Sequence, residues 1–265
     1  YKHVPMQESF PWEAVKTNVF GTKNLCEVSV QFNVEKFVLV STDKAVRPTN
    51  VMGATKRIAE IIIQNYDIIK NETAFIAVRF GNVLGSSGSV IPIFQEQIKA
   101  GGPITITDPE MERYFMSIPE ASLLILQAGS LGVSGEIFVL DMGSPIKIID
   151  IANELIRLSG LEPGNDIEIK YTGSRPGEKK VEELILPSEQ LDKTKHKKIL
   201  VINNPDIKRD MFLSIIKEIE FLKTRLSIDS PKDIRVILSK ILPEYNPNNS
   251  SVEIPFYKLD KENYN

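Results

Sequence analysis

The feature that most constrains the fold is the alternation of short apolar runs with longer helical patterns through the first two-thirds of the chain. Residues 37–40 form a continuous β-branched-rich run, which suits a strand covered on both faces, and residues 75–80 form the next strand. A helical pattern precedes each run, at residues 12–31 and 52–70. Strands that alternate with helices in this way predict a parallel α/β sheet.

Shorter elements follow this region and predict a smaller lobe packed against the sheet. They comprise helical patterns at residues 90–100, 119–131 and 147–159 and strands at 104–107, 136–141 and 167–171. Two terminal helices are expected at residues 206–226 and 231–241.

Composition excludes several kinds of partner and site. The 265 residues carry a formal net charge of −3, so no basic surface points to a nucleic acid partner. No apolar run approaches the ~18 residues of a membrane helix, and we expect no membrane contact by this segment. His3 and His196 lack the spacing of metal ligands, and we expect no metal. The single cysteine, Cys26, excludes an internal disulfide.

Polar side chains follow the first predicted strand and begin the next helix. Residues 41–44 read Ser-Thr-Asp-Lys, and Met52 and Lys56 lie four residues apart, on one helical face. In open α/β sheets, ligands bind outside the carboxyl ends of the strands, so these groups are well placed for a substrate. The alternative is that Asp43 and Lys44 form only a surface salt bridge, and these residues by themselves leave both interpretations open.

A family resemblance favours the first interpretation. Short-chain dehydrogenase/reductases place Ser or Thr at this strand end and Tyr-x-x-x-Lys on the following helix. Residues 40–57, VSTDKAVRPTNVMGATKR, resemble the nucleotide-sugar 4,6-dehydratases of the polysaccharide-biosynthesis (CapD-like) branch of the extended superfamily. Met52 stands at the tyrosine position, as in the long, membrane-anchored members. The similarity continues in order through residues 79–92, 107–116 and 175–179 and covers roughly residues 1–190.

The resemblance implies an α/β fold, a partial Rossmann-like doubly wound parallel sheet with a smaller C-terminal substrate-binding lobe. The chain opens without methionine and contains no Gly-x-Gly-x-x-Gly, so we expect its first βαβ units to be missing. The implied organisation has four parts: a cofactor-binding domain with the catalytic residues (1–100), mainly the substrate lobe interleaved with the sheet (101–200), terminal helices (201–242) and a flexible tail (243–265).

The implied activity converts UDP-N-acetylglucosamine to a UDP-4-keto-6-deoxy-N-acetylhexosamine for capsule, O-antigen or glycan synthesis, with NADP or NAD as the recycled cofactor. The sugar C4 hydroxyl is oxidised, water is eliminated across C5 and C6, and hydride returns to C6. By resemblance, Lys44 removes the C5 proton and Asp43 protonates the departing C6 hydroxyl. Neutral lysine and protonated aspartate are opposite to their ordinary ionisation, so the scheme requires a desolvated site.

Met52 departs from the superfamily pattern, because a thioether cannot relay a proton. The tyrosine's role in deprotonating the C4 hydroxyl therefore goes to Lys44 or to a water held by Thr42. Met52 itself fills space beside the nicotinamide. Lys56 is expected to hold the nicotinamide ribose, as its family counterpart does.

The resemblance also implies two binding sets. Asn82, Arg113 and Arg175 are groups that suit a pyrophosphate, Val90 and Pro92 would flank the uracil, and Glu178 would accept from ribose hydroxyls. The cofactor set is Tyr1, Ser41, Lys56, Phe80 and Val83, and the substrate set is Lys2, Asn82, Val90, Pro92, Arg113, Arg175 and Glu178.

Two other functions remain open. A nucleotide-sugar epimerase of the same superfamily has no need of an acid–base pair that expels the C6 hydroxyl, so Asp43 and Lys44 favour a dehydratase. A non-catalytic UDP-sugar-binding fragment is consistent with Met52 and the missing cofactor turn. We expect a homo-oligomer that is cytoplasmic, or on the cytoplasmic face of the inner membrane if an anchored region precedes it, and little turnover by this piece alone.

Overall fold

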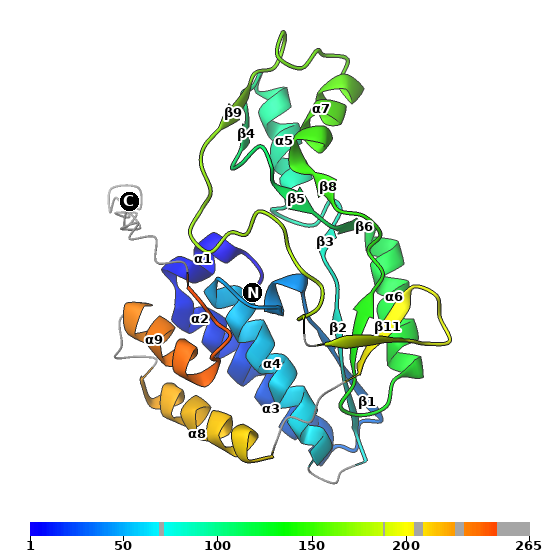
Figure 1. Ribbon diagram of the computed structural model, residues 1–265, viewed down its shortest axis with the longest axis vertical. Helices are drawn as coiled ribbons and strands as arrows, with labels where there is room; N and C mark the ends of the chain where they lie inside the picture. The colour runs from blue at the N-terminus through cyan, green and yellow to red at the C-terminus, as the bar shows by residue number, and fades with distance from the viewer. Residues whose placement is uncertain (69–71, 188, 204–208, 226–230, 248–265) are drawn as a thin grey trace, which may run out of the picture.

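The computed structural model describes residues 1–68, 72–187, 189–203, 209–225 and 231–247, and its centre is a five-stranded sheet (Figure 1). The strand order is β1-β2-β7-β11-β10. The first three strands run parallel and the last two are antiparallel to their neighbours. Their bounds are β1 Lys36–Val40, β2 Ala74–Arg79, β7 Ile137–Leu140, β10 Gln190–Lys193 and β11 Ile199–Asn203. The parallel α/β sheet predicted from the sequence is confirmed.

Helices cover both faces of this sheet, which explains the continuous apolar runs. One face carries α3 (Gly21–Gln31), α4 (Val51–Ile68), α8 (Arg209–Arg225) and α9 (Pro231–Ile241), and the other carries α6 (Ile118–Leu131) (Figure 1). In β2, Phe75 and Ala77 join the apolar cluster on the α4 side, whereas Ile76 and Val78 join the cluster with α6. Because successive strand residues face opposite ways, a strand buried on both faces has to be apolar throughout.

Helices make up most of the region before β1, as the pattern at residues 12–31 predicts. It comprises α1 (Val4–Ser9), α2 (Pro11–Ala14), the π-helical segment η1 (Val15–Phe20) and α3. The first helix is joined to α4, because Glu8 Oε1 accepts a hydrogen bond from the Val51 amide at 2.7 Å. Asn50 caps the same helix by accepting from the Gly53 amide at 2.7 Å.

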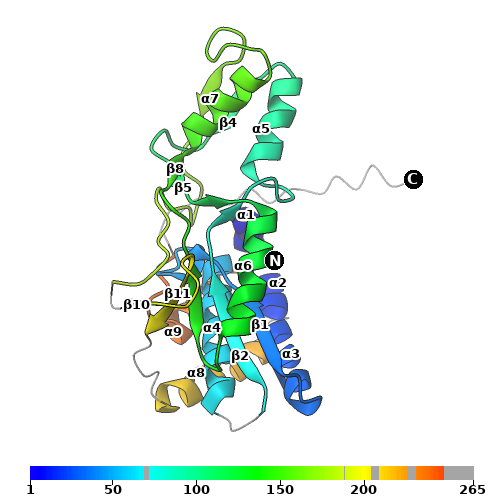
Figure 2. The same ribbon diagram turned by 90° about the vertical axis from the view of Figure 1, so that its right-hand side faces the viewer.

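A smaller lobe stands above the sheet with its own apolar cluster (Figure 2). It is built from α5 (Val90–Lys99), α7 (Ile148–Leu158) and the parallel pair β4 (Ile104–Ile106) and β9 (Ile169–Tyr171). Two short strand pairs lie between this lobe and the sheet, namely β3 (Asn82–Val83) with β6 (Phe115–Met116) and β5 (Glu112–Arg113) with β8 (Ile146–Lys147). The lobe and the sheet alternate along the chain, because β7, β11 and α6 return to the main sheet.

Two sequence expectations fall partly outside the described ranges. The helices expected at residues 206–226 and 231–241 are present as α8 and α9 where the structure describes them. Most of the tail expected at residues 243–265 lies outside the described residues. Within the described ranges, no helix combines the length and apolar character that spanning a membrane requires.

A buried ion network joins α4 to the sheet. Arg79, at the end of β2, is fully buried, and its guanidinium donates to both oxygens of Glu60 at 2.8 Å. Its remaining nitrogen donates to Glu189 Oε2 at 2.8 Å. Glu60 also accepts from Ser41 Oγ at 2.6 Å and from Arg57 Nη1 at 3.0 Å. The network therefore connects both adjacent parallel strands, the central helix and the segment that enters β10.

Charge balance makes this network stable despite its burial. Burial by itself would raise the pKa of Glu60, but Arg79 above all, then Arg57 and the Ser41 hydroxyl, outweigh it and lower that pKa to about 2. A buried carboxylate in such a setting stabilises the fold only while its cationic partners are in place.

We predict that Glu60→Gln lowers the free energy of unfolding by about 3–5 kcal/mol, because it leaves the buried Arg79 guanidinium short of a counter-charge. Urea denaturation at pH 7 measures this. Glu244→Gln is the matched control, since Glu244 also pairs with Arg57, at 3.2 Å, but is partly exposed, and its loss should cost less than about 1 kcal/mol.

The same carboxylate predicts a pH dependence. Its folded pKa lies below the ordinary value of 4.5, so its contribution is fully present above pH 4.5 and is lost as the pH falls toward about 2. Acid titrations of stability should show this decline in the wild-type protein and a smaller decline in Glu60→Gln. Equal slopes in the two proteins would contradict the assignment.

Candidate active site

Three of the predicted catalytic residues, Thr42, Asp43 and Lys44, form one turn at the carboxyl end of β1, and the other two, Met52 and Lys56, lie on α4. For this prediction we call residues 42–45 the catalytic turn. Thr42 caps the 3₁₀ turn η2 (Asp43–Ala45), with its hydroxyl oxygen accepting from the Lys44 amide at 3.4 Å. The Asp43 amide donates to the Phe80 carbonyl at 3.0 Å, just beyond the end of β2. The turn therefore spans the ends of two adjacent parallel strands, which is where α/β sheets place ligands.

Asp43 and Lys44 form a partly enclosed pair rather than a surface salt bridge. The Asp43 side chain is 0% exposed, and its Oδ1 accepts from Lys44 Nζ at 3.0 Å and from Thr42 Oγ1 at 2.8 Å. Lys44 Nζ also donates to Asn82 Oδ1 at 3.2 Å. The other oxygen of Asp43, Oδ2, is buried without a hydrogen-bond partner. The site thus holds one unsatisfied acceptor beside an ammonium group.

Gly53 allows α4 to pack against this turn. A Cβ at Gly53 would lie 2.1 Å from the Lys44 carbonyl oxygen, which is far closer than any real contact. The neighbouring Met52 is 3% exposed and does not belong to the apolar cluster that contains Val51 and Ala54. A glycine at position 53 therefore sets how closely the helix carrying Met52 and Lys56 approaches the catalytic turn.

The residues expected at the cofactor lie in different surroundings. Lys56 Nζ donates to the Val40 carbonyl at 2.5 Å, and burial lowers the pKa of this lysine while Glu60 opposes the shift. Ser41 is buried with its hydroxyl committed to Glu60. Phe80 is buried in the cluster with α6, Val83 packs against that cluster, and Tyr1 is 59% exposed. Of this set, Lys56 presents a cationic group next to the catalytic turn.

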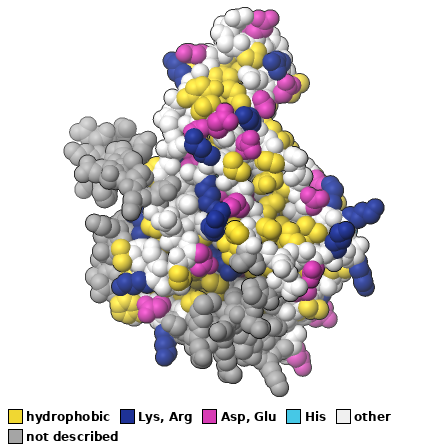
Figure 3. Space-filling view, in the orientation of Figure 1, with side chains coloured by type: hydrophobic (Ala, Val, Ile, Leu, Met, Phe, Trp, Pro, Cys, Tyr) yellow, Lys and Arg dark blue, Asp and Glu magenta, His cyan; other side chains and the backbone are white. Residues whose placement is uncertain are grey.

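A segment far along the chain covers the turn. The Gly177 carbonyl accepts from Thr49 Oγ1 at 2.8 Å and from Asn50 Nδ2 at 3.0 Å, and Lys179 Nζ donates to the Val46 carbonyl at 2.9 Å. We call residues 175–183 the strap. Lys, Arg, Asp and Glu side chains gather on the face between the upper lobe and the sheet, as Figure 3 shows.

The strap also brings two predicted substrate residues together. Arg113 is 6% exposed, its Nη1 donates to the Lys180 carbonyl at 2.9 Å, and its Nη2 lies 3.7 Å from Glu178 Oε1. Arg175 is exposed at the start of the strap. Lys2 Nζ donates to Ser86 Oγ at 3.0 Å on the surface. Val90 and Pro92 are half-buried in the first turn of α5.

Glu182 is a site residue that the sequence analysis missed. It is 4% exposed, its Oε1 lies 3.9 Å from Lys44 Nζ, and its Oε2 is buried without a partner. Burial foremost, then Asp43, raises the pKa of Glu182, while Lys44, Arg113 and Lys179 oppose the shift. Nothing in the sequence separates it from the adjacent Glu183, which pairs with Arg47 on a more exposed part of the strap.

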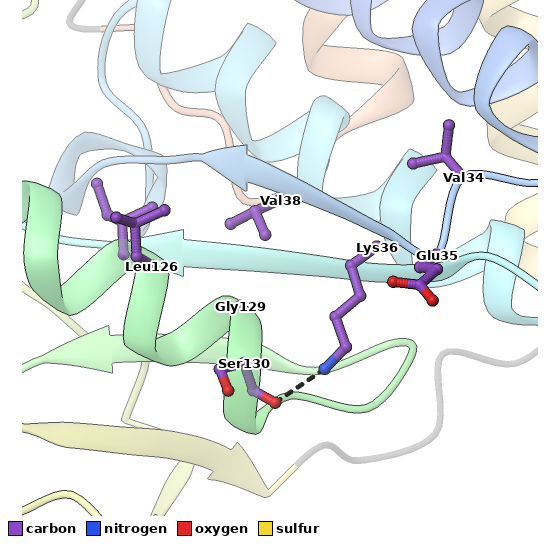
Figure 4. A pocket seen from close by; sticks show the side chains of 8 residues that line it. Val34, Glu35, Lys36, Val38, Leu126, Gly129 and Ser130 are labelled. Atoms are coloured by element: carbon purple, nitrogen blue, oxygen red, sulfur yellow. Dashed lines mark hydrogen bonds between the residues drawn. The ribbon is translucent and has the colours of Figure 1, made fainter.

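A pocket of about 500 Å³ lies elsewhere, between β1 and α6 (Figure 4). Val38, Ile125 and Leu126 line it. Lys36 and Ser130 line it too, and Lys36 Nζ donates a hydrogen bond to the Ser130 carbonyl at 2.9 Å. It starts at the amino end of β1, whereas the catalytic turn follows the carboxyl end. Since β1 is the outermost strand of the sheet, this pocket belongs to the sheet's free edge and not to the catalytic turn.

Within the ranges that the structure describes, no three His, Cys, Asp or Glu side chains gather closely enough to hold a metal ion.

Known proteins share much of the sequence of this chain. The model of a family described as "Polysaccharide biosynthesis protein" matches residues 1–204. The capsular polysaccharide biosynthesis protein CapD of Staphylococcus aureus is 60% identical over 189 residues, which are 71% of this chain and 31% of that protein. A UDP-glucose 4-epimerase of Rickettsia canadensis is 40% identical over 186 residues, 69% of this chain and 53% of that protein. The chain thus spans about a third of the length of CapD.

Solved structures show the same fold. The X-ray structure of Pen from Bacillus thuringiensis matches with a TM-score of 0.71 and 40% identity, covering 78% of this chain and 64% of that chain. A UDP-glucose 4-epimerase from Thermus thermophilus, solved with NAD, matches with a TM-score of 0.62 at 20% identity, covering 70% of this chain and 66% of that one. The arrangement is the Rossmann-type fold of these structures, as the family resemblance implies.

We predict that Gly53→Ala lowers the free energy of unfolding by about 1–3 kcal/mol, because its methyl group must displace the Lys44 carbonyl. Urea denaturation measures the effect. Gly21→Ala is the control: its Cβ would lie 3.7 Å from the nearest atom, and alanine is favoured over glycine in a helix by about 0.5–1 kcal/mol. Unchanged or increased stability of Gly53→Ala would show that the helix and the turn are not in close contact.

Proposed function

This chain belongs to the polysaccharide biosynthesis protein family, and from that premise we propose that it carries the catalytic part of a nucleotide-sugar 4,6-dehydratase. The proposed substrate is UDP-N-acetylglucosamine, and the product is a UDP-4-keto-6-deoxy-N-acetylhexosamine. The observation that carries the proposal is the enclosed Asp43–Lys44 pair at the carboxyl ends of β1 and β2.

Asp43 suits the acid that expels the C6 hydroxyl. Its Oδ2 is buried and has no protein donor, so a substrate hydroxyl placed there would satisfy it. A proton held on that oxygen would then pass to the C6 hydroxyl, which leaves as water. The carboxyl is fixed for this task, because Thr42 and Lys44 both bind its other oxygen.

Lys44 suits the base that removes the C5 proton. Its ammonium is held by Asp43 and Asn82, and only 16% of its side chain is exposed, so bulk water does not compete for the transferred proton. Thr42 donates its hydroxyl proton to Asp43, which leaves it a poor holder of a water base. Of the two candidates for deprotonating the C4 hydroxyl, we therefore propose Lys44, which would pass that proton on to Asp43 and so be a neutral amine again before it takes the C5 proton.

Residues of the strap and of β5 suit the binding of the nucleotide. Arg113 is buried yet lies 3.7 Å from its carboxylate partner Glu178, so a pyrophosphate oxygen could take up its unsatisfied donor capacity. Arg175 and Lys2 lie at the surface, where they would close over a bound nucleotide. Val90 and Pro92, at the start of α5, would flank the uracil.

The nicotinamide cofactor, NADP or NAD, would supply reversible hydride transfer at the sugar carbons. Lys56 is the group of this chain that would hold its ribose, because the ammonium lies beside the Val40 carbonyl at the end of β1. The sequence holds no Gly-x-Gly-x-x-Gly turn for the cofactor's pyrophosphate. Such a turn would have to come from another segment, and the free edge of β1, beside the pocket of Figure 4, is open to a further strand.

The second candidate is an epimerase, which the similarity to the Rickettsia UDP-glucose 4-epimerase favours. An epimerase inverts C4 without losing water, so it needs neither the unsatisfied oxygen of Asp43 nor a base at C5. The two reactions differ in the mass of the product.

The decisive assay uses a longer protein in which a dinucleotide-binding βα unit precedes Tyr1. It is incubated with UDP-N-acetylglucosamine and NADP⁺, and the sugar nucleotide is followed by mass spectrometry and proton NMR. We expect loss of one water and a new methyl doublet, with Lys44→Ala reducing the rate by at least about 100-fold. An unchanged mass with a rearranged ring spectrum would establish the epimerase instead, and binding without reaction would leave a UDP-sugar-binding role.

A separate prediction concerns this chain alone. Because it lacks a glycine turn for the cofactor's pyrophosphate, we expect it to bind NADPH much more weakly than the longer protein, by at least about 100-fold in Kd. Fluorescence titration of both proteins measures this, and UDP-N-acetylglucosamine binding serves as the control for a folded substrate site. Equal affinities for NADPH would show that these 265 residues hold the cofactor unaided.

A further inference from the structure

Glu182 is the buried carboxyl that the reaction scheme leaves without a role. Its Oε1 lies 3.9 Å from the Lys44 ammonium, and the same ammonium lies 3.0 Å from Asp43 Oδ1. Glu182 Oε2 and Asp43 Oδ2 are both buried without a hydrogen-bond partner. One lysine therefore faces two buried carboxyl groups, each with an unsatisfied oxygen.

The charges around Glu182 do not balance when every group is ionised. Lys44 then faces two carboxylates, which leaves the three groups with a net charge of one negative unit. Two other cations are near, but each already faces another carboxylate: Arg113 lies 3.7 Å from Glu178, and Lys179 lies 3.7 Å from Glu183. The pKa of Glu182 is raised, with burial as the main cause and Asp43 adding to it.

We propose that Glu182 is a positioning residue that carries a proton in the resting site and so allows Lys44 to pass its own proton to Asp43. The inference rests on the proposed dehydratase function. An N–H bond of the Lys44 ammonium breaks and an O–H bond forms on Asp43, while the Glu182 carboxyl keeps its proton. The three groups carry no net charge before or after this transfer, and they reach the neutral amine and protonated acid that elimination requires.

An ionised Glu182 would oppose this transfer. A carboxylate 3.9 Å from Nζ stabilises the ammonium form of Lys44 and disfavours the neutral amine. Its charge would also favour a proton on Asp43, but this effect is the smaller one, because Lys44 acts on Glu182 more strongly than Asp43 does. Deprotonation of Glu182 should therefore slow the step in which Lys44 acts as a base.

The neighbouring Glu183 provides a matched control. It has the same side chain and lies in the same strap, but its partners are Arg47 and Lys179 rather than Lys44. Arg47 lowers the pKa of Glu183, whereas burial raises the pKa of Glu182. Glu183→Gln should leave the protonation of the catalytic turn unchanged.

The first test measures Glu182 in this 265-residue chain by ¹³C NMR of its carboxyl carbon across pH, without any turnover. We expect its pKa to lie above the ordinary value of 4.5, to fall in Asp43→Asn, which removes a negative neighbour, and to rise in Lys44→Gln, which removes a positive one. An ordinary pKa, or one that neither substitution changes, would overturn the proposal. This outcome is independent of whether the chain supports dehydration.

The second test compares kcat across pH in the longer, active protein. Glu182→Gln keeps the side chain neutral, so its kcat relative to wild type should rise as the pH passes through the pKa of Glu182, and should stay within about tenfold of wild type below it. Glu183→Gln should give a constant ratio. A constant ratio for Glu182→Gln as well would show that Glu182 serves only in packing. A loss of kcat above about 100-fold at every pH would show that Glu182 donates a proton directly. Either result contradicts the proposal.

Discussion

The buried pairing of Glu60 with Arg79 is the interaction on which the rest of this structure depends. It fixes α4 against β2 through two hydrogen bonds of 2.8 Å, and Ser41 adds the end of β1 to the same carboxylate. The catalytic turn begins at the next residue, Thr42. Because the turn contacts both strand ends and α4, its geometry holds only while these three elements keep their relative positions.

The strap adds further side chains to the site that these three elements position. Three hydrogen bonds attach it to the segment between the turn and α4, and each joins a side chain to a backbone carbonyl: Thr49 and Asn50 donate to Gly177, and Lys179 donates to Val46. Through it, residues more than a hundred positions from Lys44 join the site: Glu178 beside Arg113, and Glu182 beside Lys44. The residues proposed for substrate binding and those proposed for proton transfer are thereby linked to one segment.

Much of the fold was readable from the sequence, because burial on both faces imposes continuous apolar strands, as in Phe75 to Val78, and helices impose their own period. Asp43, Lys44 and Asn82 were also named in advance and do meet. Ser41 illustrates what the sequence alone could not predict. Its place at a strand end suggested a ligand contact, yet its hydroxyl is committed to Glu60, nineteen residues further along the chain.

The sequence by itself determined the alternating α/β order and the residues at the strand ends, because both follow from local periodicity and chain order. Only the tertiary structure decided which charged groups became buried together. Glu182 and Glu183 are adjacent and chemically identical, but one faces Lys44 without a donor for its second oxygen and the other pairs with Arg47 near the surface. The physical reason is that desolvation and charge coupling depend on contacts between distant segments, and no local pattern records them.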